Sequence, residues 1–253
     1  MPQKPIKFNI PMGAIKFILF QRTQYLFFRR NKIMQRVVKF LPSFIAFPIE
    51  TIFTKFNSIV SIESKLFKKR VSELFSEEMF AEYEAMKKYL PQNARTILDI
   101  GCGIGGIDVL LNNHYKNTTP LIYLLDKTEM PKKVYYGLEG KGCFYNSFEV
   151  VKDFLTKNGI RDTQIFVQEA NEKNTIDFNT TFDLVISLIS WGFHYPVSVY
   201  LDQVYEKLSP GGVLIIDVRK SFGGLEALQK KFGNMEVIYD TTKHSRVILR
   251  KVI

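Results

Sequence analysis

A loop in which every second residue is glycine follows an apolar segment near the middle of the chain, with glycines at Gly101, Gly103 and Gly105. Residues 96–100 before the loop read as a strand, and residues 107–112 after it begin a helix. Glycine lets the backbone pass close to a ligand because no Cβ stands in the way. A strand, a glycine loop and a helix in this order are typical of open α/β sheets, which bind ligands beyond the carboxyl ends of their strands.

Strands and helices alternate through the rest of the chain after residue 70. Further strands are expected at residues 121–126, 164–168, 182–187 and 213–218, with a closing pair at 235–239 and 246–252. Further helices are expected at residues 71–90, 147–157, 197–208 and 225–232. This alternation predicts a parallel sheet with helices on both faces, so the expected fold class is α/β, Rossmann-like and doubly wound.

Asp99, two residues before the first glycine, indicates which kind of ligand the loop binds. Read with Gly106, the loop also matches the G-x-G-x-x-G pattern of dinucleotide-binding proteins. In such proteins the loop faces a pyrophosphate, which a neighbouring carboxylate repels, whereas a ligand with a sulfonium and an amino group is attracted. An oxidoreductase that uses NAD remains an alternative, disfavoured by Asp99 and by the lack of a second substrate domain.

Asp99, Gly101, Gly103 and Gly105 together resemble the first motif of class I S-adenosylmethionine-dependent methyltransferases. Residues 95–253 keep the order of elements of that family. The resemblance implies S-adenosyl-L-methionine as the cofactor, and a mostly parallel seven-stranded sheet that ends in an antiparallel hairpin. It also implies cofactor-binding roles beyond the loop: the ribose hydroxyls for Asp126, the adenine amino group for Glu169 or Asn171, and a further contact for Ser190.

The loop expected after the fourth strand, residues 188–196, should lie at the reacting end of the cofactor site. His194 is the candidate general base, because a hydroxyl acceptor must lose its proton and a neutral imidazole accepts one near pH 7. Trp191, Phe193 and Tyr195 are candidates for an aromatic wall that stacks on a substrate. The alternatives are a histidine that only packs within the loop, and aromatic residues that belong to the core.

The expected acceptor is a hydroxyl group of a small molecule or a glycan. The loop lacks the Asn/Asp-Pro-Pro-aromatic motif of amino-group methyltransferases and the Pro-Cys nucleophile of cytosine C5 enzymes, which favours O-methylation. Residues 131–145 are longer than a minimal connection and are expected to shape the cofactor or acceptor pocket. The two cysteines, Cys102 and Cys143, have no spacing typical of metal ligands, so no metal is expected.

The net charge of the chain divides near residue 70. Residues 1–70 hold 14 Lys and Arg against 2 Asp and Glu, whereas residues 71–253 hold 21 against 23. We therefore expect two domains: a basic, aromatic-rich helical region at 1–70 and a methyltransferase domain at 71–253. The basic region could cap the main domain, or lie on an anionic membrane with Phe and Leu side chains in the interface. No apolar run reaches 18 residues, so no membrane-spanning helix is expected. The low cysteine usage fits a reducing compartment, so the expected location is cytoplasmic, with a peripheral membrane contact as an option.

Two further functions remain open. An RNA-directed methyltransferase would use residues 1–70 as its binding arm, and its RNA affinity would depend strongly on salt. The fold could also serve as a binding subunit that catalyses nothing.

Overall fold

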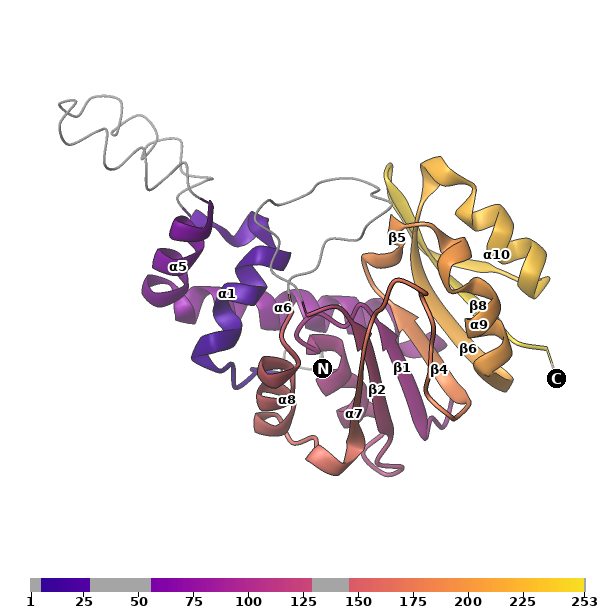
Figure 1. Ribbon diagram of the computed structural model, residues 1–253, viewed down its shortest axis with the longest axis horizontal. Coiled ribbons are helices and arrows are strands. Elements are labelled where there is room, and N and C mark those ends of the chain that lie inside the picture. The colour runs from indigo at the N-terminus through magenta and orange to yellow at the C-terminus, as the bar shows by residue number, and fades with distance from the viewer. Residues whose placement is uncertain (1–5, 28–55, 129–145, 253) are drawn as a thin grey trace. The chain divides into compact units, whose positions relative to one another are not determined.

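The computed structural model describes residues 6–27, 56–128 and 146–252 (Figure 1). Residues 131–145, which we expected to shape a pocket, lie outside the described residues. The chain divides into two compact units, Met1–Glu78 and Met79–Ile253, and each is described by itself. The division falls within helix α6 (Lys68–Met86), which also runs through the expected boundary at residue 70. The helix continues there because Val71, Phe75 and Met79 form a buried stripe at four-residue spacing.

The unit Met79–Ile253 is built on a seven-stranded sheet with the strand order β3-β2-β1-β4-β6-β8-β7 (Figure 1). The strands are β1 (Thr96–Ile100), β2 (Leu121–Asp126), β3 (Ile165–Glu169), β4 (Phe182–Ser187), β6 (Leu208–Arg219), β7 (Glu236–Asp240) and β8 (His244–Arg250). β1 to β4 and β6 pair in parallel, while β8 runs antiparallel to both β6 and β7. This order confirms the Rossmann-like, doubly wound fold and its closing antiparallel hairpin.

Helices and short turns connect the strands and cover the sheet. The α-helices are α7 (Gly106–His114), α8 (Phe148–Lys157), α9 (Leu201–Lys207) and α10 (Gly224–Phe232). The 3-10 turns are η2 (Lys87–Tyr89), η3 (Asp162–Gln164), η4 (Val197–Val199) and η5 (Lys220–Phe222). Val204 of α9 and Leu228 of α10 are buried in one apolar cluster with residues of β1, β4 and β6. The central strands are continuous apolar runs because both of their faces are covered.

The segment after β4 differs from the expected loop. It forms the short strand β5 (Ser190–Tyr195), which stands outside the order of the seven-stranded sheet and lies against β6. Gly192 permits this close approach, because its φ is +83° and an added Cβ would lie 2.9 Å from the Asp217 carbonyl oxygen. Trp191 is fully buried, and its indole N–H donates to the Val197 carbonyl at 2.9 Å. The expected loop is thus a short strand, and Trp191 belongs to the core, as the alternative interpretation had it.

The unit Met1–Glu78 is helical in its described parts, which confirms the expected helical N-terminal region. It contains α1 (Met12–Gln21), η1 (Thr23–Tyr25), α5 (Phe56–Leu66) and the first residues of α6, and α1 contacts α5. Glu78 ties η1 to α6, since its carboxylate accepts from the Tyr25 hydroxyl at 2.5 Å and from Arg22 Nε at 2.7 Å. Within the described ranges, every helix is too short or too polar to span a bilayer.

Candidate active site

The glycine loop leaves the carboxyl end of β1, where the strand order reverses between β1 and β4. The Gly101 N–H donates to the Leu125 carbonyl at 2.7 Å, which ties the loop to β2. The φ of Gly101 is +79°, and a Cβ added there would lie 1.7 Å from Ser190 Oγ. Only glycine fits at this contact. The structure thus brings together Gly101 and Ser190, two residues that the sequence assigned to one cofactor site.

Asp126, at the end of β2, holds the glycine loop at Gly103. Its Oδ2 accepts from the Gly103 N–H at 2.9 Å and from Asn146 Nδ2 at 2.8 Å, and its Oδ1 accepts from the Lys127 N–H at 2.7 Å. Burial raises the pKa of Asp126, and these hydrogen bonds act against the rise. A carboxylate has about four acceptor positions, so Oδ1 keeps capacity for a ligand hydroxyl.

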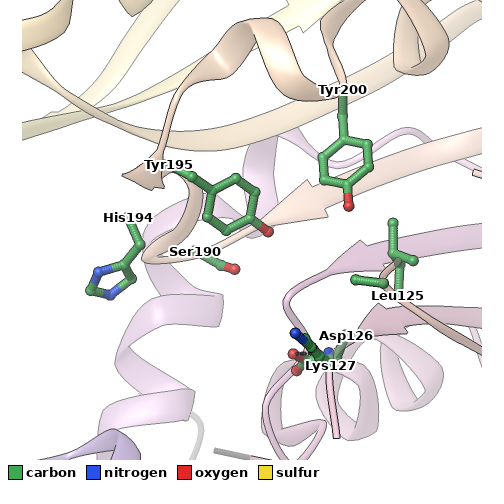
Figure 2. A pocket seen from close by; sticks show the side chains of 8 residues that line it. Leu125, Asp126, Lys127, Ser190, His194, Tyr195 and Tyr200 are labelled. Atoms are coloured by element: carbon green, nitrogen blue, oxygen red, sulfur yellow. Dashed lines mark hydrogen bonds between the residues drawn. The ribbon is translucent and has the colours of Figure 1, made fainter. Parts of the chain in front are cut away.

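A pocket opens beside Asp126, between the ends of β2 and β3 and the strand β5 (Figure 2). Figure 2 shows the hydroxyl groups of Tyr195 and Tyr200 turned into this space, with Ser190 nearby and the His194 ring at one side. The residues that line it are Leu125, Asp126, Lys127, Ala170, Ser190, His194, Tyr195 and Tyr200. The pocket therefore joins the predicted ribose-binding acid to the predicted general base.

Tyr195 and His194 differ in what they can do in this pocket. Burial raises the pKa of the Tyr195 hydroxyl far above its usual range, so this group stays protonated and acts as a hydrogen-bond donor. His194 is half-buried in the same wall, and a neutral imidazole accepts a proton near pH 7. Of the two side chains, only the histidine suits the role of base.

The other predicted substrate residues lie elsewhere. Trp191 is enclosed in the core, as described above. The Phe193 ring packs under the Arg219 guanidinium at 4.4 Å and against the His244 ring at 5.4 Å. Neither side chain lines the pocket. Of the expected aromatic wall, the pocket contains only Tyr195.

The two candidates for reading adenine are exposed and hydrogen-bonded to neighbouring threonines. Glu169 Oε1 accepts from the Thr128 hydroxyl at 2.8 Å, and Asn171 Nδ2 donates to Thr175 Oγ1 at 3.1 Å. Ala170 between them lines the pocket instead, and its N–H donates to the Asp126 carbonyl at 2.8 Å. The adenine role of Glu169 or Asn171 stays a prediction.

Sequence reasoning missed several residues of this site. Tyr200 and Lys127 line the pocket, and the buried Asn146 orients Asp126 from a position just before α8. Lys127 directly follows the predicted ribose acid, so its position could have suggested it. Tyr200 and Asn146 are brought in by tertiary packing and belong to no recognisable motif.

Two further acidic or nucleophilic groups are Asp99, near the end of β1, and Cys102, within the glycine loop. Asp99 is only 3% exposed, and burial raises its pKa well above the usual carboxyl range. Burial and the nearby Asp126 charge likewise raise the pKa of the Cys102 thiol, so this cysteine stays protonated and is a poor nucleophile. Among the described residues, no three His, Cys, Asp or Glu side chains gather as metal ligands would.

No family model and no curated protein matches the chain. Among solved structures, a provisionally named O-methyltransferase of Nostoc punctiforme is 15% identical with a TM-score of 0.50, and the match covers 73% of this chain and 59% of that one. The O-MT segment of StiE is 14% identical with the same TM-score of 0.50, over 73% of this chain and 76% of that one. Identities this low establish the fold alone. The chain has the Rossmann-like fold of class I methyltransferases.

Proposed function

We propose that the chain is an S-adenosylmethionine-dependent methyltransferase that acts on a hydroxyl group of a small molecule or a glycan. The observation that carries this proposal is that Asp126, which accepts a hydrogen bond from the glycine loop at Gly103, lines one pocket together with His194. S-Adenosyl-L-methionine, when bound, supplies an electrophilic methyl group.

The residues present fit this cofactor better than they fit a dinucleotide. Gly101 and Ser190 lie in such close contact that the loop has no room for a larger side chain. Burial raises the pKa of the Cys102 thiol in the loop, and three nearby carboxyl groups, Asp126, Asp99 and Asp108, add to the rise. That acidic surrounding favours a cation and repels a pyrophosphate, which argues against the oxidoreductase alternative.

The chain's own part in the reaction is to position the acceptor and to remove its proton. An acceptor hydroxyl placed in the pocket would lie near the Tyr195 and Tyr200 hydroxyls and Ser190, with the His194 ring at one side. His194 takes the proton from the acceptor oxygen, while the tyrosines donate hydrogen bonds that fix the acceptor's orientation.

Calorimetry with S-adenosylmethionine, S-adenosylhomocysteine and NAD tests the choice of cofactor. The first two are expected to bind, and Asp126→Ala is expected to weaken that binding by about 1–3 kcal/mol, roughly 5- to 150-fold in Kd, because ribose hydroxyls lose their acceptor. Asp162→Ala removes an exposed acid of η3, at the opposite end of β3, and should leave Kd unchanged. Tighter binding of NAD than of S-adenosylmethionine would contradict the proposal.

We further propose that residues 1–70 bind an anionic lipid surface, supported by their excess of 14 basic over 2 acidic residues. The apolar residues Ile15, Phe17 and Phe20 of α1 are buried, so the attraction should depend on charge rather than on insertion. The full chain should bind vesicles rich in phosphatidylserine at low salt and lose roughly tenfold or more of that affinity at high salt, with little binding to neutral vesicles.

Matched lysine variants locate the contact. Binding should fall in a variant with glutamine at four exposed lysines of the first unit, Lys7, Lys16, Lys65 and Lys69. It should persist with glutamine at four exposed lysines of the second unit, Lys116, Lys173, Lys230 and Lys243. Equal binding to neutral and anionic vesicles contradicts this proposal, and preference for single-stranded RNA over both would favour the RNA-directed alternative.

A further inference from the structure

A buried carboxyl group that no motif assigns lies directly under the glycine loop. Asp108, in the first turn of α7, has no exposed surface. A Cβ added to Gly105 would lie 3.4 Å from Asp108 Oδ2, so the carboxyl packs against the loop backbone. Neither Asp108 oxygen has a hydrogen-bond partner of regular geometry among the described residues. A buried carboxylate without such partners is costly, so this group requires an explanation.

Its nearest titratable neighbour is Asp99 at the end of β1. Burial, followed by the proximity of Asp108, raises the pKa of Asp99, and burial raises the pKa of Asp108 to about 7. The groups facing this pair are Asp126 from β2, Cys102 from the loop and Tyr195 from β5, and the first of these also raises the pKa of Asp99. Two neighbouring buried carboxyl groups do not both ionise readily without a positive charge nearby, so in the free protein the pair retains a proton at neutral pH.

We propose that Asp108 is a specificity-determining residue of the cofactor site, which shares one proton with Asp99 in the free protein and releases it when a cationic ligand binds. This inference rests on the proposed function. Asp108 does not contact the ligand in this proposal. It responds to the ligand's charge through Asp99 and the glycine loop.

Because S-adenosylmethionine and its demethylated product differ in charge, this pair of carboxyl groups can distinguish them. S-Adenosylmethionine carries one positive charge more than S-adenosylhomocysteine, because demethylation neutralises the sulfonium. The extra positive charge of the sulfonium lowers the pKa of the pair, so the shared proton passes to solvent. Both carboxyl groups are then ionised, and the added negative charge balances the sulfonium. The neutralised product does not favour this second ionisation, so the pair takes its proton back and the product binds less tightly.

Calorimetry in buffers of different ionisation enthalpy counts the protons released on binding. Between pH 6 and 8 the wild type should release markedly more protons with S-adenosylmethionine than with S-adenosylhomocysteine. Its preference for the former should rise with pH, by up to about tenfold per pH unit, as one released proton requires. In Asp108→Asn the pKa of Asp99 falls, so the proton count near pH 7 should drop by half or more, and Asp162→Asn should behave as wild type.

The outcomes separate this inference from the proposed function. Equal proton release with both ligands in the wild type overturns the inference, and this comparison needs no variant to fold. An unchanged proton count in a folded Asp108→Asn variant overturns it as well, because a merely structural Asp108 would alter stability but not the linkage. If neither ligand binds the wild type, the proposed function fails and the inference fails with it.

Discussion

Arg246→Leu is expected to lower the free energy of unfolding by about 3–5 kcal/mol, because it leaves a buried carboxylate without its counter-charge. Arg246 of β8 is only 1% exposed. Its Nε donates to Asp217 Oδ1 at 2.7 Å and its NH2 group to Asp217 Oδ2 at 2.8 Å, while its NH1 group binds Glu82. Asp217 on β6 is completely buried, so without Arg246 it must either stay charged in the core or take up a proton.

Urea denaturation followed by the fluorescence of Trp191, the only tryptophan and fully buried, measures this loss. Arg250→Leu is the control on the same strand, since Arg250 is exposed and should change stability by less than about 1 kcal/mol. Adding Asp217→Asn to Arg246→Leu should recover part of the loss, because the buried charge disappears while an acceptor oxygen remains. A midpoint for Arg246→Leu equal to that of Arg250→Leu would show that the ion pair contributes nothing.

His194→Ala is expected to lower turnover by about 10²–10⁴-fold while the affinity for S-adenosylmethionine stays near that of the wild type. His194 lines the pocket beside Asp126, and the neighbouring Tyr195 is protonated at neutral pH and cannot replace it as the base. The loss should be largest near pH 7 and shrink at high pH, where hydroxide removes the acceptor's proton.

The assay transfers a labelled methyl group to a panel of sugars and small hydroxyl compounds, and turnover is then measured on the acceptor found. His114→Ala is the control, because His114 ends α7, outside the pocket, where its Nδ1 shares a hydrogen bond of 2.8 Å with the Tyr83 hydroxyl. Full turnover in His194→Ala would leave positioning as the sole catalytic contribution of the pocket. Loss of cofactor binding in that variant would point to a structural role for His194.

The sheet was predictable because its strands carry strong local signals. The expected bounds of β2 and β4 coincide with the observed ones, since both are apolar runs that end in a polar residue. β6 begins at Leu208 rather than at residue 213, because Leu208 pairs with Phe182 and the Gly211 N–H binds the Lys251 carbonyl at 3.0 Å. The Pro-Gly-Gly sequence keeps a turn-like backbone at Gly211, whose φ is +74°, but its hydrogen bond to a partner distant in sequence makes it part of the strand.

The site was predictable only where a motif fixes the backbone. Gly101 and Asp126 follow strands directly, so their places were clear from order alone. Asn146 and Asp108 reach the same loop from the start of α8 and the first turn of α7, and no local pattern marks either one. Trp191 shows the opposite error: an aromatic residue near a site was taken for a ligand contact, although its burial makes it part of the core.

The ion pair of Arg246 and Asp217 also determines when, during synthesis, the strand beside the glycine loop can be held in place. Asp217 Oδ2 accepts from the Ile189 N–H at 3.1 Å, and the next residue, Ser190, touches the glycine loop. Arg246 is synthesised 29 residues after Asp217. The nascent chain therefore contains the glycine loop and Asp217 before it contains the arginine that pairs with Asp217. Until Arg246 has been added, the strand beside the glycine loop lacks this electrostatic anchor. The position of Ser190 against the glycine loop therefore depends on the closing hairpin, although the loop itself is translated long before Arg246.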